Sequence, residues 1–412
     1  MAGIEFPAEL QKRMEETAPV DLLVGVTGAV DVEALRVKVG RLRGLALDGE
    51  GSHPSRIAVA YAGVDSDDPV TVTEEGVLLA RYPMPAAAGE MNLWRDVSNV
   101  QRNVLALAAG WQARACMVVY SDLAALEPET VRTFAEPVLK GGIDLLMPIY
   151  PAGKYDALIN KSLLAPMSRA LYGRRVRWPL TADFCAGAKM LEKLADGSRV
   201  KSEAGLLWPA NLVAMQGGQI NQAGLNVRHA PPGEGLDLNA VVRELAGSLF
   251  EEAEANAAQW QRTRASQPAT RYGDPYPQVE QEEPVDTRPM VESFVIASQN
   301  LEEVWRLVLP PATVLELKRM ARLAPEQFRL ADAVWARIVY DFALAHRMRR
   351  VSRTHVLGAL TPLYLGWVAG YVQEVSGATA QEAERRVDQL AKVFEEQKPY
   401  LVSRWRWPER AV

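Results

Sequence analysis

The sequence predicts an α/β domain over residues 1–265, a linker over 266–290 and an all-helical domain over 291–412. From Asp21 to about Val227, short apolar runs alternate with longer stretches of helical period, which is typical of α/β domains. From Ser293 to Trp407 nearly every segment has helical period, and no strand pattern of comparable strength is present. The segment between them is rich in proline and acid and poor in aliphatic residues, as linkers are.

Short apolar runs are expected to form the strands, and amphipathic stretches the helices. The expected strands are DLLVGV (21–26), RIAVAY (56–61), GVLLARY (76–82), CMVVY (116–120), IDLLMPIY (143–150) and QINQAGLNV (219–227). The expected helices of the first domain cover 32–45, 97–111, 128–142 and 238–264, and those of the second include 300–309, 312–323, 332–348 and 380–401.

Composition and charge restrict the kind of protein. The chain is 48% hydrophobic and 24% charged, an ordinary globular composition, and its net charge is −5. Because no basic field is present, we expect no nucleic-acid partner. The N-terminus lacks the apolar core of a signal peptide, and Cys116 lies in an apolar run that favours a reduced, packed thiol. We therefore expect a soluble, cytoplasmic protein.

One uncharged segment, Val356 to Gln373, has two interpretations. Its eighteen residues are at the lower limit for a membrane span. The alternative is a buried helix broken at Pro362. The proline, the glycines and the single copy of such a segment favour the buried helix, so we expect no membrane insertion.

Two residues at predicted strand ends could hold a metal ion. Asp122 follows the apolar run of MVVYSDLAALEPE, and His229 follows the segment GLNVR. A carboxylate at a strand end can bind Mg²⁺ or Mn²⁺, which prefer oxygen ligands. On these residues alone, a strand-ending turn or helix cap is favoured for Asp122, and a loop or core imidazole held by backbone groups for His229.

A polar block follows the strand expected at 143–150. It contains YPAGKYDALIN, in which Asp156 and Asn160 are four residues apart and would share one helix face. The stretch LYGRRVRWPLTADF comes next, with several arginines before a proline turn that ends at Asp183. Such arginines suit a phosphate or carboxylate, or simply the solvated end of a helix.

In this order, the pieces resemble retaining glycosyltransferases of the GT-A fold, the glucosylglycerate and mannosylglycerate synthase-like group. Members show an acid-x-acid motif after a central strand, then G-D-P-x-Y-x-R-x-x-x-D-G-T-I-T-N, then P-x-x-R-A-L-Y-G-x-R-V-R-Q-P-I-G-G-D/E, and a late histidine. The run GGIDLLMPIYPAGKYDALINKSLLAPMSRALYGRRVRWPLTADF carries the resemblance. It extends from about Met117 to Trp405 and implies a GT-A domain, Rossmann-like and of the nucleotide-diphospho-sugar transferase type, followed by a helical extension.

The resemblance also implies roles for individual residues. Asp122 matches the usual metal ligand and His229 its co-ligand, while Asp183 matches the acid that ends the glycine turn, so Asp122 and Asp183 are the candidate catalytic residues. The candidate substrate-binding residues are those at the remaining motif positions: Tyr120, Ser121, Asp156, Asn160, Arg177, Thr181 and Ala182.

The chain departs from the motifs at several of these positions. Tyr120 stands in place of the first acid, and Tyr61 in place of an aspartate expected to contact the base. Trp178 replaces glutamine, and Thr181 and Ala182 replace two glycines that would let backbone approach the ligand. The departures indicate an altered active site.

Two function hypotheses follow. The first is a glycosyltransferase that moves a hexose from a UDP- or GDP-linked nucleotide sugar to a small acceptor, such as a hydroxy acid like glycerate, with retention and with Mg²⁺ or Mn²⁺. The second is a catalytically degenerate pseudo-glycosyltransferase that acts as a binding or scaffold protein. The apolar segments LGWVAGYV and WRW could pack within the chain or across a homodimer.

Overall fold

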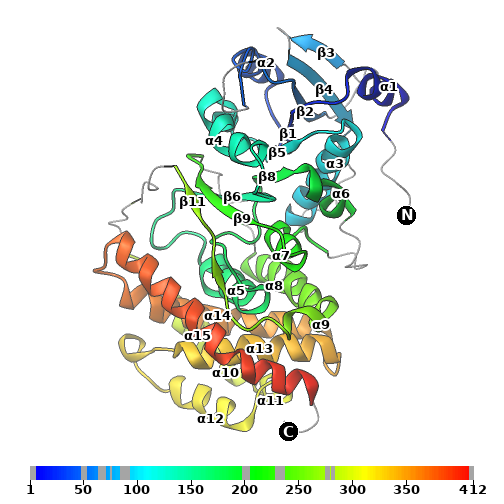
Figure 1. Cartoon of the computed structure of the whole chain (residues 1–412). Helices are drawn as coiled ribbons and strands as arrows, with labels where there is room; N and C mark the ends of the chain where they lie inside the picture. The colour runs from blue at the N-terminus through cyan, green and yellow to red at the C-terminus, as the bar shows by residue number, and fades with distance from the viewer. Residues whose placement is uncertain are drawn as a thin grey trace.

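The computed structural model shows an α/β domain with a mixed sheet, followed by a group of packed helices (Figure 1). It describes residues 6–47, 53–63, 71–74, 77–83, 93–196, 205–227, 237–273, 279 and 284–407. The expected combination of an α/β domain with a helical region is confirmed at this level.

Nine strands in the described residues form the sheet, in the order β11-β9-β6-β8-β5-β1-β2-β4-β3. Most neighbours are parallel, but β8 is antiparallel to both β5 and β6, and β3 is antiparallel to β4. The strands are β1 (Leu22–Val26), β2 (Ile57–Gly63), β3 (Thr71–Glu74), β4 (Val77–Pro83), β5 (Ala115–Val119), β6 (Leu145–Ile149), β8 (Phe184–Gly187), β9 (Ile220–Gly224) and β11 (Arg271–Tyr272).

Both faces of the sheet are buried, which explains the continuous apolar runs of the strands. In β5, Cys116 and Val118 pack in one core with α3 and α6, whereas Met117 and Val119 pack in the other with α2 and α4. The two cysteines of the chain are free and buried. The helices around the sheet are α1 (Ala8–Thr17), α2 (Val32–Gly40), α3 (Leu93–Gly110), α4 (Pro128–Leu139), α6 (Ala188–Asp196) and α7 (Pro209–Met215).

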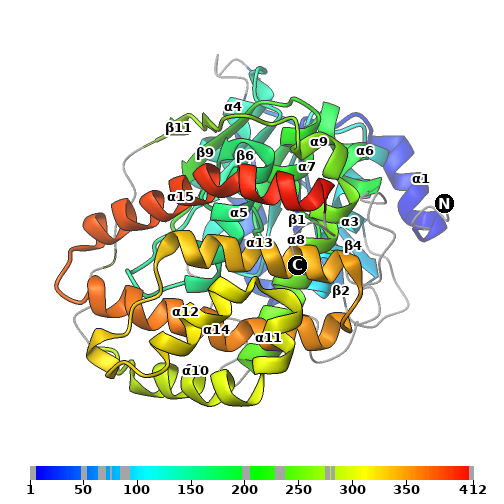
Figure 2. The same ribbon diagram turned by 90° about the horizontal axis from the view of Figure 1, so that it is seen from below.

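A third core joins the two predicted domains. It contains α5 and α8 from before residue 265 together with helices from after residue 284. Helix α15 packs along α5 (Figure 2). The indole N–H of Trp335 donates to the Ser162 carbonyl at 2.8 Å. The helices that contribute to this core are α5 (Ala165–Tyr172), α8 (Leu238–Ala255), α10 (Arg288–Asn300), α11 (Glu302–Val308), α12 (Pro311–Met320), α13 (Asp332–Met348), α14 (Arg353–Glu374) and α15 (Ala380–Arg406).

The segment predicted as a linker, 266–290, begins with residues that pair with strands. Gln267–Pro268 forms β10, which pairs with β7 (Arg174–Arg175), and Arg271–Tyr272 forms β11 at the edge of the main sheet. The first part of this segment is therefore attached to the α/β domain by backbone hydrogen bonds.

Helix α14 contains the uncharged segment and runs through Pro362 without a break. The expectation of a helix broken at this proline was wrong, although the segment is buried as expected. One carbonyl in the turn before the proline, that of Ala359, accepts a hydrogen bond from the Trp305 indole at 3.0 Å. Within the described residues, no helix is both long and apolar enough to cross a membrane.

Candidate functional site

The order of the strands reverses at the boundary between β1 and β5. From β1 the chain builds outward through β2 and β4, and it then returns to place β5 on the other side of β1. Open α/β sheets bind ligands outside the carboxyl ends of the strands at such a switch point. Thr27 and Gly28 follow β1 here, and the predicted residues Tyr120, Ser121 and Asp122 follow β5.

The two loops at the switch point contact each other. The Thr27 N–H donates to the Val119 carbonyl at 2.9 Å, and the Gly28 N–H donates to the Tyr120 carbonyl at 3.3 Å. A Cβ at Gly28 would lie only 2.7 Å from the Ser121 Cβ. A glycine is therefore needed for the β1 loop to approach Ser121 this closely.

Asp122 is partly exposed at the start of a short 3₁₀ helix, η1 (Leu123–Leu126). Its Oδ1 accepts the Ala124 N–H at 2.9 Å, so the residue is a helix cap. Across the part of the chain that the structure describes, its other carboxylate oxygen has no hydrogen-bond or ion-pair partner. The cap thus leaves one hard oxygen donor available at the switch point.

Asp183, in contrast, is buried and engaged on both oxygens. Its Oδ1 accepts the Tyr120 N–H at 2.8 Å, and its Oδ2 accepts the Tyr150 hydroxyl proton. Burial, and then the charge of Asp183, raise the pKa of Tyr150 well above its usual value, so this hydroxyl stays protonated. Asp183 therefore connects the ends of β5, β6 and β8.

The turn that replaces the two glycines is filled by side chains. Thr181 Oγ1 lies 2.6 Å from the Tyr150 hydroxyl, and the ring of Trp178 packs edge-on against the Tyr150 ring at 5.3 Å. Gln101 Nε2 donates to the Thr181 and Ala182 carbonyls at 2.9 and 3.1 Å. Thr181 and Ala182 thus occupy the interior, where glycines would leave room for a ligand.

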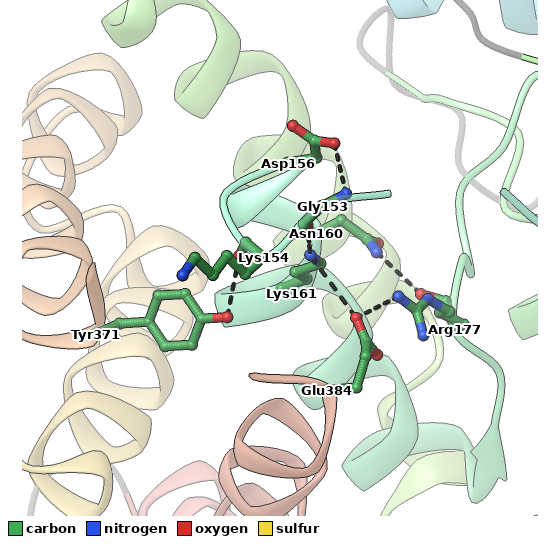
Figure 3. A network of polar contacts seen from close by, with 8 residues as sticks. All are labelled: Gly153, Lys154, Asp156, Asn160, Lys161, Arg177, Tyr371 and Glu384. Atoms are coloured by element: carbon green, nitrogen blue, oxygen red, sulfur yellow. Dashed lines mark hydrogen bonds and ion pairs between the residues drawn. The ribbon is translucent and has the colours of Figure 1, made fainter. Parts of the chain in front are cut away.

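The polar block that follows β6, with Asp156, Asn160 and Arg177, matches the acceptor side in the resemblance and is called the acceptor block below. It forms a network of polar contacts next to this turn (Figure 3). Asp156 accepts the Gly153 N–H at 2.7 Å, and Asn160 Nδ2 donates to the Arg177 carbonyl at 2.9 Å. Asn160 is 6% exposed, yet its Oδ1 has no hydrogen-bond partner in the described part of the chain, and neither has the buried indole N–H of the neighbouring Trp178. Buried polar atoms are seldom left unpaired, so each of these two atoms indicates a place where a ligand or water would bind.

A carboxylate from the helical region completes the network. Glu384 of α15 forms ion pairs with Arg177 and, at 3.7 Å, with the ammonium group of Lys161. Lys161 is 3% exposed and donates to the Gly153 carbonyl at 2.6 Å. Burial lowers the pKa of Lys161 to about 8, and Glu384 opposes that shift.

Glu384 was not among the residues expected from the sequence. A signal was present, because Glu384, Asp388 and Glu395 share one face of α15 by their i, i+4, i+11 spacing. Asp388 and Glu395 both bind the buried Arg169 of α5. An acidic helix face opposite an arginine-rich segment could have predicted this contact between the two regions.

The structure brings together only some of the predicted residues. Tyr120, Ser121, Asp122 and Asp183 lie around the end of β5, whereas Asp156, Asn160 and Arg177 belong to the network beside α15. His229 lies outside the described residues. Among the described residues, no group of three or more His, Cys, Asp or Glu side chains could hold a metal ion.

Comparison with protein-family models yields no match, and comparison with curated proteins yields none either.

Proposed function

We propose that this chain is a glycosyltransferase that moves a hexose from a UDP- or GDP-linked nucleotide sugar to a small acceptor, such as a hydroxy acid, with retention. The observation that carries the proposal is the position of Asp122 at the β1/β5 switch point, with one carboxylate oxygen unengaged within the described residues. Sheets of this kind bind their ligands at this place. The resemblance of the acceptor block to GT-A enzymes supports the same function.

The residues at the β5 end suit a divalent ion in part. Asp122 offers a carboxylate oxygen and Ser121 a hydroxyl, both hard donors of the kind that Mg²⁺ and Mn²⁺ accept. The second ligand implied by the resemblance, His229, is outside the described residues. An ion bound here would balance the charge of the departing nucleotide diphosphate.

The unpaired atoms of Asn160 and Trp178 support an acceptor site beside the turn that runs from Arg177 to Asp183. Asn160 Oδ1 can accept a hydrogen bond from a hydroxyl group, and the Trp178 indole can donate one. The guanidinium of Arg177 lies in the same network. Asn160 and Trp178 match a small molecule that carries hydroxyls, and Arg177 would bind a carboxylate by sharing its guanidinium with Glu384.

The activity can be tested with purified protein, Mn²⁺ and a set of UDP- and GDP-linked hexoses, with glycerate as acceptor. Mass spectrometry would detect the hexosyl product, and the anomeric coupling in its NMR spectrum would report retention. Absence of both transfer and hydrolysis with every donor would contradict the proposal.

A second function is favoured by a different observation. Asp183 is engaged on both oxygens, and Thr181 and Ala182 fill the turn that the family keeps open with glycines. These features suit a degenerate glycosyltransferase domain that serves as a binding or scaffold protein. For such a protein, neither nucleotide nor Mn²⁺, separately or together, would raise the melting temperature.

A further inference from the structure

A cavity of about 470 Å³ lies where the acceptor block meets the helical region. Its walls come from the Lys154–Tyr155 loop, the start of α10, the short 3₁₀ helix η3 (Pro325–Gln327) and the end of α14. This volume is within the range of about 300–1,000 Å³ that small-molecule sites occupy. The lining residues that matter here are Lys154, Thr287, Arg288, Glu326, Arg329 and Gln373.

Lys154 brings a nearly buried positive charge to the cavity. The residue is 6% exposed, and its ammonium group donates to the Ser376 and Ala378 carbonyls at 2.8 and 3.2 Å. Over the residues that the structure describes, no carboxylate pairs with it. The charge is therefore balanced by carbonyl dipoles and by the Tyr155 ring, whose centroid lies 5.2 Å from the ammonium nitrogen, and a positive potential remains at the cavity wall.

Two arginines add to this potential. Arg329 approaches a carboxylate oxygen of Glu374 only to 3.6 Å, and its side chain is 56% exposed. Arg288 binds Asp286 at 2.8 Å but is 70% exposed. The long, exposed pair of Arg329 contributes little free energy, so its guanidinium group can turn toward an anion in the cavity. Arg288 holds Asp286 through Nε and Nη2, which leaves its Nη1 to donate to an anion.

Neutral hydrogen-bonding groups also line the cavity, beside the exposed carboxylate of Glu326, which offsets one of the three positive charges. Thr287 precedes the first turn of α10, and its Oγ1 accepts a hydrogen bond from Gln373 Nε2 at 3.0 Å, so its own hydroxyl proton can be donated to a ligand. The same Gln373 nitrogen donates to the Pro325 carbonyl at 2.9 Å, which fixes the side-chain amide. The positive end of the α10 dipole lies at the same wall.

We propose that this cavity binds a small anion whose charged end is a phosphate or a carboxylate. The site differs from the one assigned above to the nucleotide sugar and its acceptor. Figure 3 shows the Lys154 side chain pointing toward α14 and Tyr371, on the opposite side of Lys161 from Arg177. The Lys154 carbonyl accepts the Tyr371 hydroxyl at 3.0 Å, and Gly153, its neighbour, binds Asp156 and Lys161. A ligand at Lys154 would therefore contact the acceptor block from the helical side.

Isothermal titration calorimetry on the full chain tests the site, with inorganic phosphate and succinate as probes at constant ionic strength in chloride. We expect saturable binding of at least one probe. Arg329→Gln and Arg288→Gln should each weaken it by about tenfold, the loss of about 1.4 kcal/mol that one charged contact provides. Arg322→Gln is the matched control, because Arg322 is an exposed arginine of the same region outside the cavity lining, and it should leave the affinity unchanged.

Saturation by phosphate alone would assign a phosphate ligand, and saturation by succinate alone a carboxylate ligand. The proposal is overturned if neither probe saturates, or if Arg322→Gln weakens binding as much as the two cavity variants. Asp122→Asn should not change the affinity for either probe. If nucleotides fail to bind while phosphate or succinate binding still depends on Arg329, the proposed transferase function is contradicted and the anion site is supported.

Discussion

The carboxylate of Asp183 accepts the backbone N–H of Tyr120 at 2.8 Å and thereby pairs the first N–H after β5. Its second oxygen accepts the Tyr150 hydroxyl proton, so one buried side chain connects three strand ends of the sheet. The acid that the resemblance implied for catalysis thus stabilises the fold around the switch point. Any reactive role for Asp183 would require these contacts to change.

Asp183→Asn should destabilise the protein. An amide offers one acceptor oxygen in place of two, so either the Tyr120 N–H or the Tyr150 hydroxyl loses its buried partner. We expect the free energy of unfolding to fall by about 1–3 kcal/mol. Urea denaturation followed by tryptophan fluorescence measures the change.

Tyr150→Phe provides the control for that contact. It removes the hydroxyl alone, and its effect should be smaller in the Asp183→Asn background than in the wild type, because the two residues share one interaction. Additive effects, within about 0.3–0.5 kcal/mol, would show that the two side chains do not interact.

Glu384→Gln should weaken the attachment of α15 to the acceptor block. The substitution removes the carboxylate that pairs with Arg177 and with the nearly buried Lys161. The two positive charges then lose part of their compensation in a buried environment. We expect the free energy of unfolding to fall by about 1–3 kcal/mol. Thermal denaturation of Glu396→Gln is the control, because Glu396 lies on the exposed face of the same helix. Equal effects of the two substitutions would argue against the network.

Lys161 should make stability depend on alkaline pH. Its pKa is lowered by burial from 10.5 to about 8, so between these values the folded protein has released a proton that the unfolded chain still holds. Raising the pH through this window therefore stabilises the folded state, and below about pH 8 the benefit is absent. From pH 7.5 to 9.5, the free energy of unfolding of the wild type should rise by about 2 kcal/mol relative to Lys161→Met. A difference that stays constant, or falls, over this range would contradict the assignment.

Elements with strong local patterns could be predicted from the sequence. The strands around Val24, Val59 and Met117 are uninterrupted apolar runs because both faces of the sheet are covered. The segment within α14 was correctly expected to be buried, but not to continue through Pro362. The proline removes the hydrogen bond to the Gly358 carbonyl four residues before it, but the helix continues on both sides, where its buried side chains pack in the core.

Features that depend on distant residues could not be predicted. Strand β8 reads only Phe-Cys-Ala-Gly, too short for a strand pattern, and becomes a strand because β5 and β6 lie on either side of it. Residues 267–272 pair with strands for the same reason. In the site, the position of Asp122 at a strand end was predictable, whereas the contact of Glu384 with Arg177 spans two regions of the chain.

The central claim is that the end of β5 binds a nucleotide diphosphate together with a divalent ion, and titration of UDP and GDP into the wild type and Asp122→Asn tests it most directly. Asparagine caps a helix as well as aspartate does, so this variant should keep the stability of the wild type while it loses the charged oxygen. We predict saturable binding of one nucleotide to the wild type only when Mn²⁺ is present, and binding at least about tenfold weaker in Asp122→Asn. Equal affinity in the two proteins, or no binding to the wild type with or without Mn²⁺, would contradict it.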